Sequence, residues 1–246
     1  MKITYNPQIY KYLLKSIPIG IGTSAVCFLM PNQKILKIYY SPYYKKVLSQ
    51  KEDIISYFQL LSDISNDTYI GPEEVIIINN ECFGYIYPYI KGKTLHSIKN
   101  VITPKDILNK YPKLEEDTKK ISEHLFLLSD LHDRNIILNH IINVIDLDRG
   151  NIKQDFSVND IYNCNLADIN KTFIYSLFNT NFDQILEFYN PDINKLYRLS
   201  IGKEPFRFPE FLEELERINT STNNKALILR KNIPHSKTQN SYYKYF

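Results

Sequence analysis

The chain has 246 residues, a formal net charge of +3, and a composition that is 43% hydrophobic and 13% aromatic. A chain of this length and apolar content can bury a core without disulfide bonds, which excludes intrinsic disorder as its main state. The nearly neutral charge argues against a nucleic-acid-binding protein, and three cysteines without a C-x-x-C pair argue against a disulfide scaffold or a zinc ribbon.

The first 90 residues are predicted to form a β-rich lobe that contains one main helix. Its strands are apolar or alternating stretches between turn signals, and they cover residues 13–20, 25–30, 34–39, 74–78 and 82–88. Apolar residues at helical spacing among charged residues predict an amphipathic helix from about residue 44 to residue 65. Turns are predicted at Pro31-Asn32-Gln33 and at Asn79-Asn80.

The rest of the chain, residues 91–246, is predicted to form a mainly helical second lobe. Thr103, Pro104 and Asp106 indicate a helix start, because threonine can cap a helix and proline fits its first position. Further helices are predicted over about 114–128, from about 160 onward and over 211–218, with brief strands at 136–138 and 143–146. The predicted fold class is therefore α+β, with two lobes joined by a hinge near residues 88–92.

A glycine pair near the N-terminus is the first candidate for chemistry. Gly20 and Gly22, followed by Ala25, fit the pattern G-x-G-x-x-G/A. A Rossmann loop would open a helix and have an acid about 20 residues later, but the next stretch is strand-like and residues 40–50 contain no acid. The alternatives are a glycine-rich loop between antiparallel strands, which can cover a nucleotide's phosphates, and a plain tight turn.

A lysine in the middle of an apolar strand is the second candidate. Lys37 follows Ile35 and Leu36, and an unpaired ammonium buried there would cost several kcal/mol. Glu52 on the following helix is the predicted carboxylate partner, with Asp53 as its neighbour and competitor. The other interpretations are a solvated lysine on an edge strand and an exposed glutamate on a helix.

Two stretches in the middle of the chain complete a sequence pattern that includes the glycine pair and the strand lysine. Residues 128–138 have the sequence LSDLHDRNIIL, and residues 144–150 have the sequence VIDLDRG. Here the chain resembles the protein-kinase-like superfamily, whose catalytic loop has the pattern D-x-x-x-x-N and is followed by an apolar strand that ends in D-F-G or D-x-D. The resemblance spans about residues 20–170. Each element is common alone, and it is their order and spacing that carry the resemblance.

The resemblance implies a role for each polar residue of the two stretches. Asp130 would orient the attacking hydroxyl and accept its proton, and Asn135 with Asp146 would hold magnesium ions. Asp148 would be a second metal-site carboxylate, or a polar residue at a strand end. Such a site suits phosphoryl transfer, which depends mainly on in-line positioning and on cancelling charge.

The resemblance also implies an ATP site with Mg²⁺. Gly20, Gly22, Lys37 and Glu52 would surround the phosphates of ATP. The hinge would bind adenine through the Pro88 carbonyl and the Ile90 amide, with Tyr87 at the back of the pocket. Tyr87 is otherwise an ordinary strand aromatic.

The chain departs from protein kinases at several positions. Leu128-Ser129 replaces the His-Arg that usually precedes the catalytic aspartate, so activation by a loop phosphate is not expected. His132 replaces a lysine, which is similar to the aminoglycoside and choline kinase branch and to compact bacterial or viral kinase-like proteins. Asp168 resembles the buried aspartate that braces the catalytic loop.

Three functions are compatible with these residues. The first is an ATP- and Mg²⁺-dependent kinase that phosphorylates a hydroxyl, with protein serine or threonine favoured over a small molecule of aminoglycoside or choline type. The second is that small-molecule phosphotransferase itself, and the third is a nucleotide-binding pseudokinase that acts as a scaffold. The retention of Lys37, Asp130, Asn135 and Asp146 together argues against the third.

The surroundings of the protein can also be predicted. No run reaches the ~18 apolar residues of a membrane span, so we expect no membrane contact and a cytoplasmic location, in the host cytoplasm if a virus encodes the chain. Residues 225–246 carry five basic residues, no acid and several aromatics. This tail is a candidate contact for a protein partner, or a segment that packs back on the second lobe.

Overall fold

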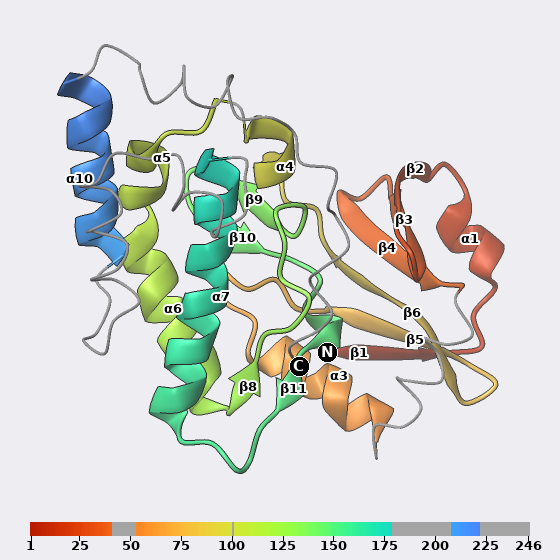
Figure 1. The fold of residues 1–246 in the computed structure, drawn as a ribbon. Helices are drawn as coiled ribbons and strands as arrows, with labels where there is room; N and C mark the ends of the chain where they lie inside the picture. Colours follow the sequence, from red (N-terminus) through yellow and green to blue (C-terminus); the bar gives the residue numbers. More distant parts are fainter. Residues whose placement is uncertain (41–52, 100, 179–207, 222–246) are drawn as a thin grey trace. The chain divides into compact units, whose positions relative to one another are not determined.

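The computed structural model describes residues 1–40, 53–99, 101–178 and 208–221, which form a mixed α+β structure (Figure 1). The chain divides into two compact units, residues 1–98 with 109–173 and residues 99–108 with 174–246. The first unit contains the whole of the predicted β-rich lobe together with the predicted catalytic stretches. The predicted division into lobes after residue 90 stays a prediction.

A six-stranded sheet forms the N-terminal part of the first unit (Figure 1). Its strands are β1 (Lys2–Tyr5), β2 (Ile17–Ile21), β3 (Ala25–Leu29), β4 (Lys34–Tyr39), β5 (Glu74–Ile78) and β6 (Glu81–Pro88). They lie in the order β1-β5-β6-β4-β3-β2, with β1 parallel to β5 and every other neighbouring pair antiparallel. Four of the five predicted strands lie within two residues of their predicted bounds, and β1 was not predicted.

The fifth predicted strand, over 13–20, starts too early. Helix α1 occupies Ile9–Leu13, and β2 begins only at Ile17. Apolar residues of α1 at helical spacing face the sheet, where they pack against Leu36, Ile76 and Ile86 together with other partly buried residues. The residues that pack from α1 are Ile9, Tyr12 and Leu13. Leu13 therefore ends a helix that covers the sheet and does not begin a strand.

Helix α3 (Ile54–Asp63) is the described part of the amphipathic helix predicted from residue 44. Asp53 caps it, because its side chain accepts a hydrogen bond from the Ile55 N–H at 2.9 Å. Tyr57, Phe58 and Leu61 are buried on one side of the helix. Residues 41–52 lie outside the described part of the chain.

Short strands and longer helices complete the first unit. They are β7 (Lys93–Thr94), α4 (Leu95–Ile98), α6 (Tyr111–Glu123), β8 (Phe126–Leu127), β9 (Ile136–Leu138), β10 (Ile142–Val144), the 3₁₀ helix η1 (Leu147–Arg149), β11 (Asn151–Ile152) and α7 (Val158–Phe178), whose last residues belong to the second unit. The strands pair in the order β10-β9-β7 and as β11-β8. The helix predicted over 114–128 is wrong at its end, because Leu125 has a left-handed backbone with φ 54° and β8 follows.

The second unit contains two described helices that contact each other, α5 (Pro104–Leu108) and α10 (Phe208–Ser221). The predicted start of α5 is confirmed, since Thr103 and Asp106 exchange hydrogen bonds in a capping box. The helix predicted over 211–218 is confirmed within α10, which buries Phe211 and Leu212. None of the described helices is both long and apolar enough to cross a membrane.

Candidate active site

Lys37 lies in β4 with its ammonium group buried between two carboxylates. Its side chain is 6% exposed, and its Nζ pairs with Asp146 and lies 3.0 and 3.2 Å from the two carboxylate oxygens of Asp148. Burial alone would lower the pKa of Lys37, but the charges of Asp148 and Asp146 outweigh it and raise the pKa. Lys37 is therefore a buried, charged lysine, and the interpretation as a solvated edge lysine is wrong.

The two aspartates have different surroundings although they are two residues apart. The Asp148 side chain has no exposed surface, and it accepts a hydrogen bond from the Tyr39 hydroxyl. Burial opposes ionisation of Asp148, but the Lys37 charge and the Tyr39 hydroxyl lower its pKa. Asp146 is 30% exposed, and burial together with the charge of Asp148 raises its pKa to about 6. With both carboxylates ionised, Lys37, Asp146 and Asp148 together carry one net negative charge.

The predicted partner of Lys37 on the helix is Glu52. Glu52 lies outside the described residues, so its pairing with Lys37 stays a prediction. Its competitor Asp53 is engaged elsewhere, because its carboxylate caps α3 and accepts from the Ser56 hydroxyl. Among the described residues, the carboxylates that hold Lys37 come from the loop after β10, about 110 residues along the chain.

The predicted catalytic stretch forms a hydrogen-bonded loop beside Asp146. The Asn135 side-chain amide donates to the Asp130 carbonyl at 3.1 Å, and the Ile145 N–H donates to the Asn135 carbonyl at 2.9 Å. Asp130, Asn135 and Asp146 line one small pocket, whose remaining walls are mainly apolar. Asp130 and Asp146 have left-handed backbones, with φ 57° and 69°. The structure thus brings the three predicted residues together.

Arg149 is a site residue that the sequence interpretation missed. Its guanidinium pairs with the Asp130 carboxylate at 2.8 Å and donates to the Ser24 hydroxyl, at 3.4 Å, in the turn between β2 and β3. The Ser129 hydroxyl donates to the Arg149 carbonyl at 2.8 Å. Arg149 therefore links the glycine-containing turn to the candidate base. Its position directly after Asp148 was the only signal in the sequence.

The residue that braces the predicted catalytic loop is Asn165, and the prediction of Asp168 is wrong. The Asn165 side chain accepts from the Leu128 N–H at 2.8 Å and donates to the Phe126 carbonyl at 2.9 Å. Asn165 is fully buried in α7, whereas the Asp168 carboxylate is 44% exposed and pairs with Lys171. An amide fits this position because it can donate and accept at once, which a carboxylate cannot do.

Gly20 lies near the end of β2 and Gly22 in the turn that follows it, and the fold itself requires glycine at neither position. Neither has a positive φ; a Cβ at Gly20 would meet nothing within 4 Å, and one at Gly22 would make only ordinary contact, at 3.6 Å. Gly84 differs, since a Cβ there would lie 2.1 Å from the Lys37 carbonyl oxygen. The two glycines leave the backbone there uncovered, as close approach of a ligand would need.

The predicted hinge follows the end of β6. Tyr87 is buried in β6, and its pKa is raised by burial and by the neighbouring Cys27. Pro88 ends the strand, Ile90 follows it partly exposed, and the Tyr89 N–H donates to the Gln33 carbonyl at 3.1 Å. The structure places Tyr87 on the strand next to β4, which carries Lys37. The contact of Pro88 and Ile90 with adenine stays a prediction.

The donor set in the pocket fits Mg²⁺. Within residues 1–40, 53–99, 101–178 and 208–221, no group of three or more His, Cys, Asp or Glu side chains could hold a metal ion. Mg²⁺ usually binds through one or two protein carboxylates and otherwise through water and substrate phosphates, so it does not need such a group. Asp146 offers a partly exposed carboxylate with excess negative charge beside it, and the Asn135 amide lines the same pocket.

Comparison with known proteins places the chain in no family. No protein-family model matches the sequence, and no curated protein matches it either. The functional argument therefore depends on the residues of this chain.

Proposed function

We propose that the chain is an ATP- and Mg²⁺-dependent kinase with a two-lobed, protein-kinase-like fold. The observation that carries the proposal is that Asp130, Asn135 and Asp146 line one pocket and that Asp146 also pairs with the buried Lys37. A buried cation, a partly exposed carboxylate with an amide beside it, and a second carboxylate are the groups that phosphoryl transfer needs. The uncovered backbone at Gly20 and Gly22 supports the same assignment, because nothing within the fold requires glycine there.

Each residue of the group has a role in the proposed reaction. The hydroxyl oxygen of the substrate attacks the γ-phosphorus, the bond to the β,γ-bridging oxygen breaks, ADP leaves, and Asp130 accepts the hydroxyl proton. Lys37 holds the α- and β-phosphates. Mg²⁺, bound by Asp146 and Asn135, would neutralise phosphate charge when present.

In the proposed reaction, Arg149 exchanges Asp130 for phosphate as its partner. In the described arrangement it pairs with Asp130, so the arginine compensates the negative charge of the candidate base. An incoming phosphate can attract the guanidinium away from Asp130, because arginine binds phosphate in the same bidentate manner as it binds carboxylate. Asp130 would then be released to accept a proton when ATP is bound.

We propose protein serine or threonine as the hydroxyl donor, with a small-molecule hydroxyl as the alternative. The discriminating experiment incubates the purified chain with γ-labelled ATP, Mg²⁺ and either a mixture of proteins or a set of aminoglycosides and choline. Label in protein supports the first substrate class, and label in the small molecules supports the second.

The catalytic claim is tested with one variant and one matched control. Asp130→Asn removes the proton acceptor and should lower the transfer or ATP hydrolysis rate by at least about 100-fold. Asp155→Asn makes the same change at an exposed position and should leave the rate unchanged. Equal rates for the wild type and Asp130→Asn would refute catalysis at this pocket, and ATP binding without any transfer would identify a pseudokinase.

A further inference from the structure

Asp148 is buried, and the proposed reaction described above gives it no role. Its side chain is fully buried, and its two oxygens lie 3.0 and 3.2 Å from the Lys37 ammonium. The Tyr39 hydroxyl donates to the nearer of these two oxygens. Lys37 and Tyr39 lie two residues apart on β4, so alternation along the strand directs both side chains to Asp148. Asp148 is thus held by two groups of a single strand.

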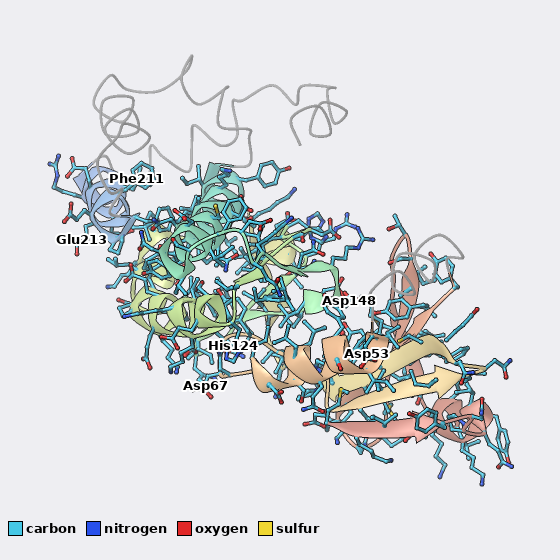
Figure 2. The ribbon with its side chains drawn as sticks, turned by 90° about the horizontal axis from the view of Figure 1, so that it is seen from below. Asp53, Asp67, His124, Asp148, Phe211 and Glu213 are labelled. Carbon is cyan, nitrogen blue, oxygen red and sulfur yellow. The ribbon has the colours of Figure 1, made fainter. Side chains whose placement is uncertain are left out.

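The backbone of the same loop is held by α3. The Tyr57 hydroxyl donates a shared hydrogen bond to the carbonyls of Asp148 and Gly150, at 3.0 and 2.7 Å. Figure 2 shows Asp148 near the start of α3, where Asp53 caps the helix. Gly150 is packed so closely that a Cβ there would lie 2.1 Å from the Phe126 ring. The loop that carries Asp148 therefore has one well-defined position relative to Lys37.

We propose that Asp148 is the positioning residue for Lys37, which it holds toward the phosphates of ATP, and that it is not a ligand of Mg²⁺. The inference rests on the proposed function for the ATP site itself. In protein kinases the carboxylate that holds this lysine belongs to a helix, and movement of that helix switches the enzyme. Here the holding carboxylate, Asp148, lies two residues after Asp146 in the segment that follows β10, so we expect Lys37 to be positioned without a helix switch.

Accessibility separates the roles of the two aspartates. A Mg²⁺ ion needs octahedral space for waters and phosphate oxygens around its protein ligands. The Asp146 carboxylate is 30% exposed and lines the pocket, whereas the Asp148 side chain has no exposed surface and does not line it. The Lys37 ammonium contacts both carboxylate oxygens of Asp148, whereas its contact with Asp146 is through Oδ1.

The first test measures ATP affinity by calorimetry, once with Mg²⁺ and once with EDTA. Asp148→Asn keeps the size of the side chain and removes its charge, Glu52→Gln tests the predicted helix partner as the competing residue, and Asp155→Asn is the matched control at an exposed position. We expect Asp148→Asn to weaken ATP binding about tenfold or more under both conditions, because a lysine acts on phosphate as a point charge without the metal. Glu52→Gln should change the affinity by less than about threefold.

Two results of this test would overturn the inference. A loss of affinity in Asp148→Asn that occurs only with Mg²⁺ would make Asp148 a metal ligand. An equal loss in Glu52→Gln would give the positioning role to the helix glutamate. Tyr39→Phe removes only the hydroxyl that holds Asp148, and it should weaken ATP binding in the same metal-independent direction; it decides the question if Asp148→Asn does not fold.

A second test needs no nucleotide, and it separates this inference from the proposed function. In a double-mutant cycle, the unfolding equilibrium constants of Lys37→Met, Asp148→Asn and the double variant should deviate from additivity by at least about tenfold. The corresponding cycle with Glu52→Gln should be additive within about twofold. If wild-type protein binds no ATP, the proposed function fails, but the cycle still decides which carboxylate holds Lys37; additivity with Asp148 would overturn the pairing.

Discussion

Replacing Lys37 by methionine should destabilise the protein much more than an ordinary lysine substitution. Methionine retains most of the apolar stem of lysine and removes the ammonium, which leaves the buried Asp148 and the partly buried Asp146 without their shared cation. Removing one partner of a buried ion pair costs about 3–5 kcal/mol, because the remaining charge is left uncompensated. That is a large part of the ~5–15 kcal/mol that stabilises a typical domain.

The pH dependence of this loss follows from the pKa of Asp148 with and without Lys37. In the wild type, the pKa of Asp148 is lowered although the group is buried, chiefly through the Lys37 charge, so Asp148 adds stability above its unfolded pKa. Without Lys37, burial dominates, and the pKa of Asp148 rises above its unfolded value. The folded variant then binds more protons than the unfolded chain, and its stability falls as pH rises. The difference between wild type and variant should therefore be larger at about pH 8 than at about pH 5.

Urea denaturation, monitored by far-UV circular dichroism, measures both effects. Circular dichroism is the readout because the chain has 20 tyrosines but no tryptophan whose fluorescence could be monitored. Lys34→Met is the matched control on the same strand, because Lys34 is 40% exposed and pairs with the exposed Glu73; its effect should stay below about 1 kcal/mol. A loss below about 1 kcal/mol in Lys37→Met, or an equal loss at both pH values, would refute the buried-charge argument.

Three further substitutions test how the site is held. Gly84→Ala should lower the free energy of unfolding by several kcal/mol, because its Cβ would lie 2.1 Å from the Lys37 carbonyl oxygen and β6 would have to move; thermal melting measures this. Asn165→Ala should cost about 1–3 kcal/mol in urea denaturation by leaving buried backbone groups unpaired, whereas Asp168→Ala on the same helix should cost less than about 0.5 kcal/mol. Tyr57→Phe should cost about 1 kcal/mol and increase hydrogen exchange of the loop amides around residue 150; unchanged exchange would contradict its role in holding the loop.

The strands and their turns were largely predictable because their signals are local. Alternation and turn residues placed β3 to β6 correctly, and the capping pair of Thr103 and Asp106 placed the start of α5. Strand β1 was not predictable in this way, because its four residues pair with β5, 72 residues along the chain. A short strand whose pairing depends on a distant partner has no signal of its own in the sequence.

Within the candidate site, the sequence predicted that Lys37 needs a partner. It did not predict which residues that partner would be. The apolar neighbours of Lys37 predicted that it needs an anion, and a helix carboxylate was the nearest candidate. The described partners, Asp146 and Asp148, come from a loop whose approach to β4 depends on the tertiary fold. The prediction of Asp168 as the bracing residue failed for a similar reason, because the loop backbone presents both an N–H and a carbonyl, and only the folded structure shows that both are bound by Asn165.

Two features of the candidate site cost stability. Asp130 and Asp146 have left-handed backbones, a conformation that costs a non-glycine residue about 1 kcal/mol or more. Asp146 also has a pKa raised to about 6 by burial and by the charge of Asp148, so ionising it near neutral pH works against folding. Neither feature improves packing, and an asparagine at position 146 would avoid the second cost. Carboxylates held in this way are stabilised when a cation and a phosphate-bearing ligand bind, which supports the proposed function.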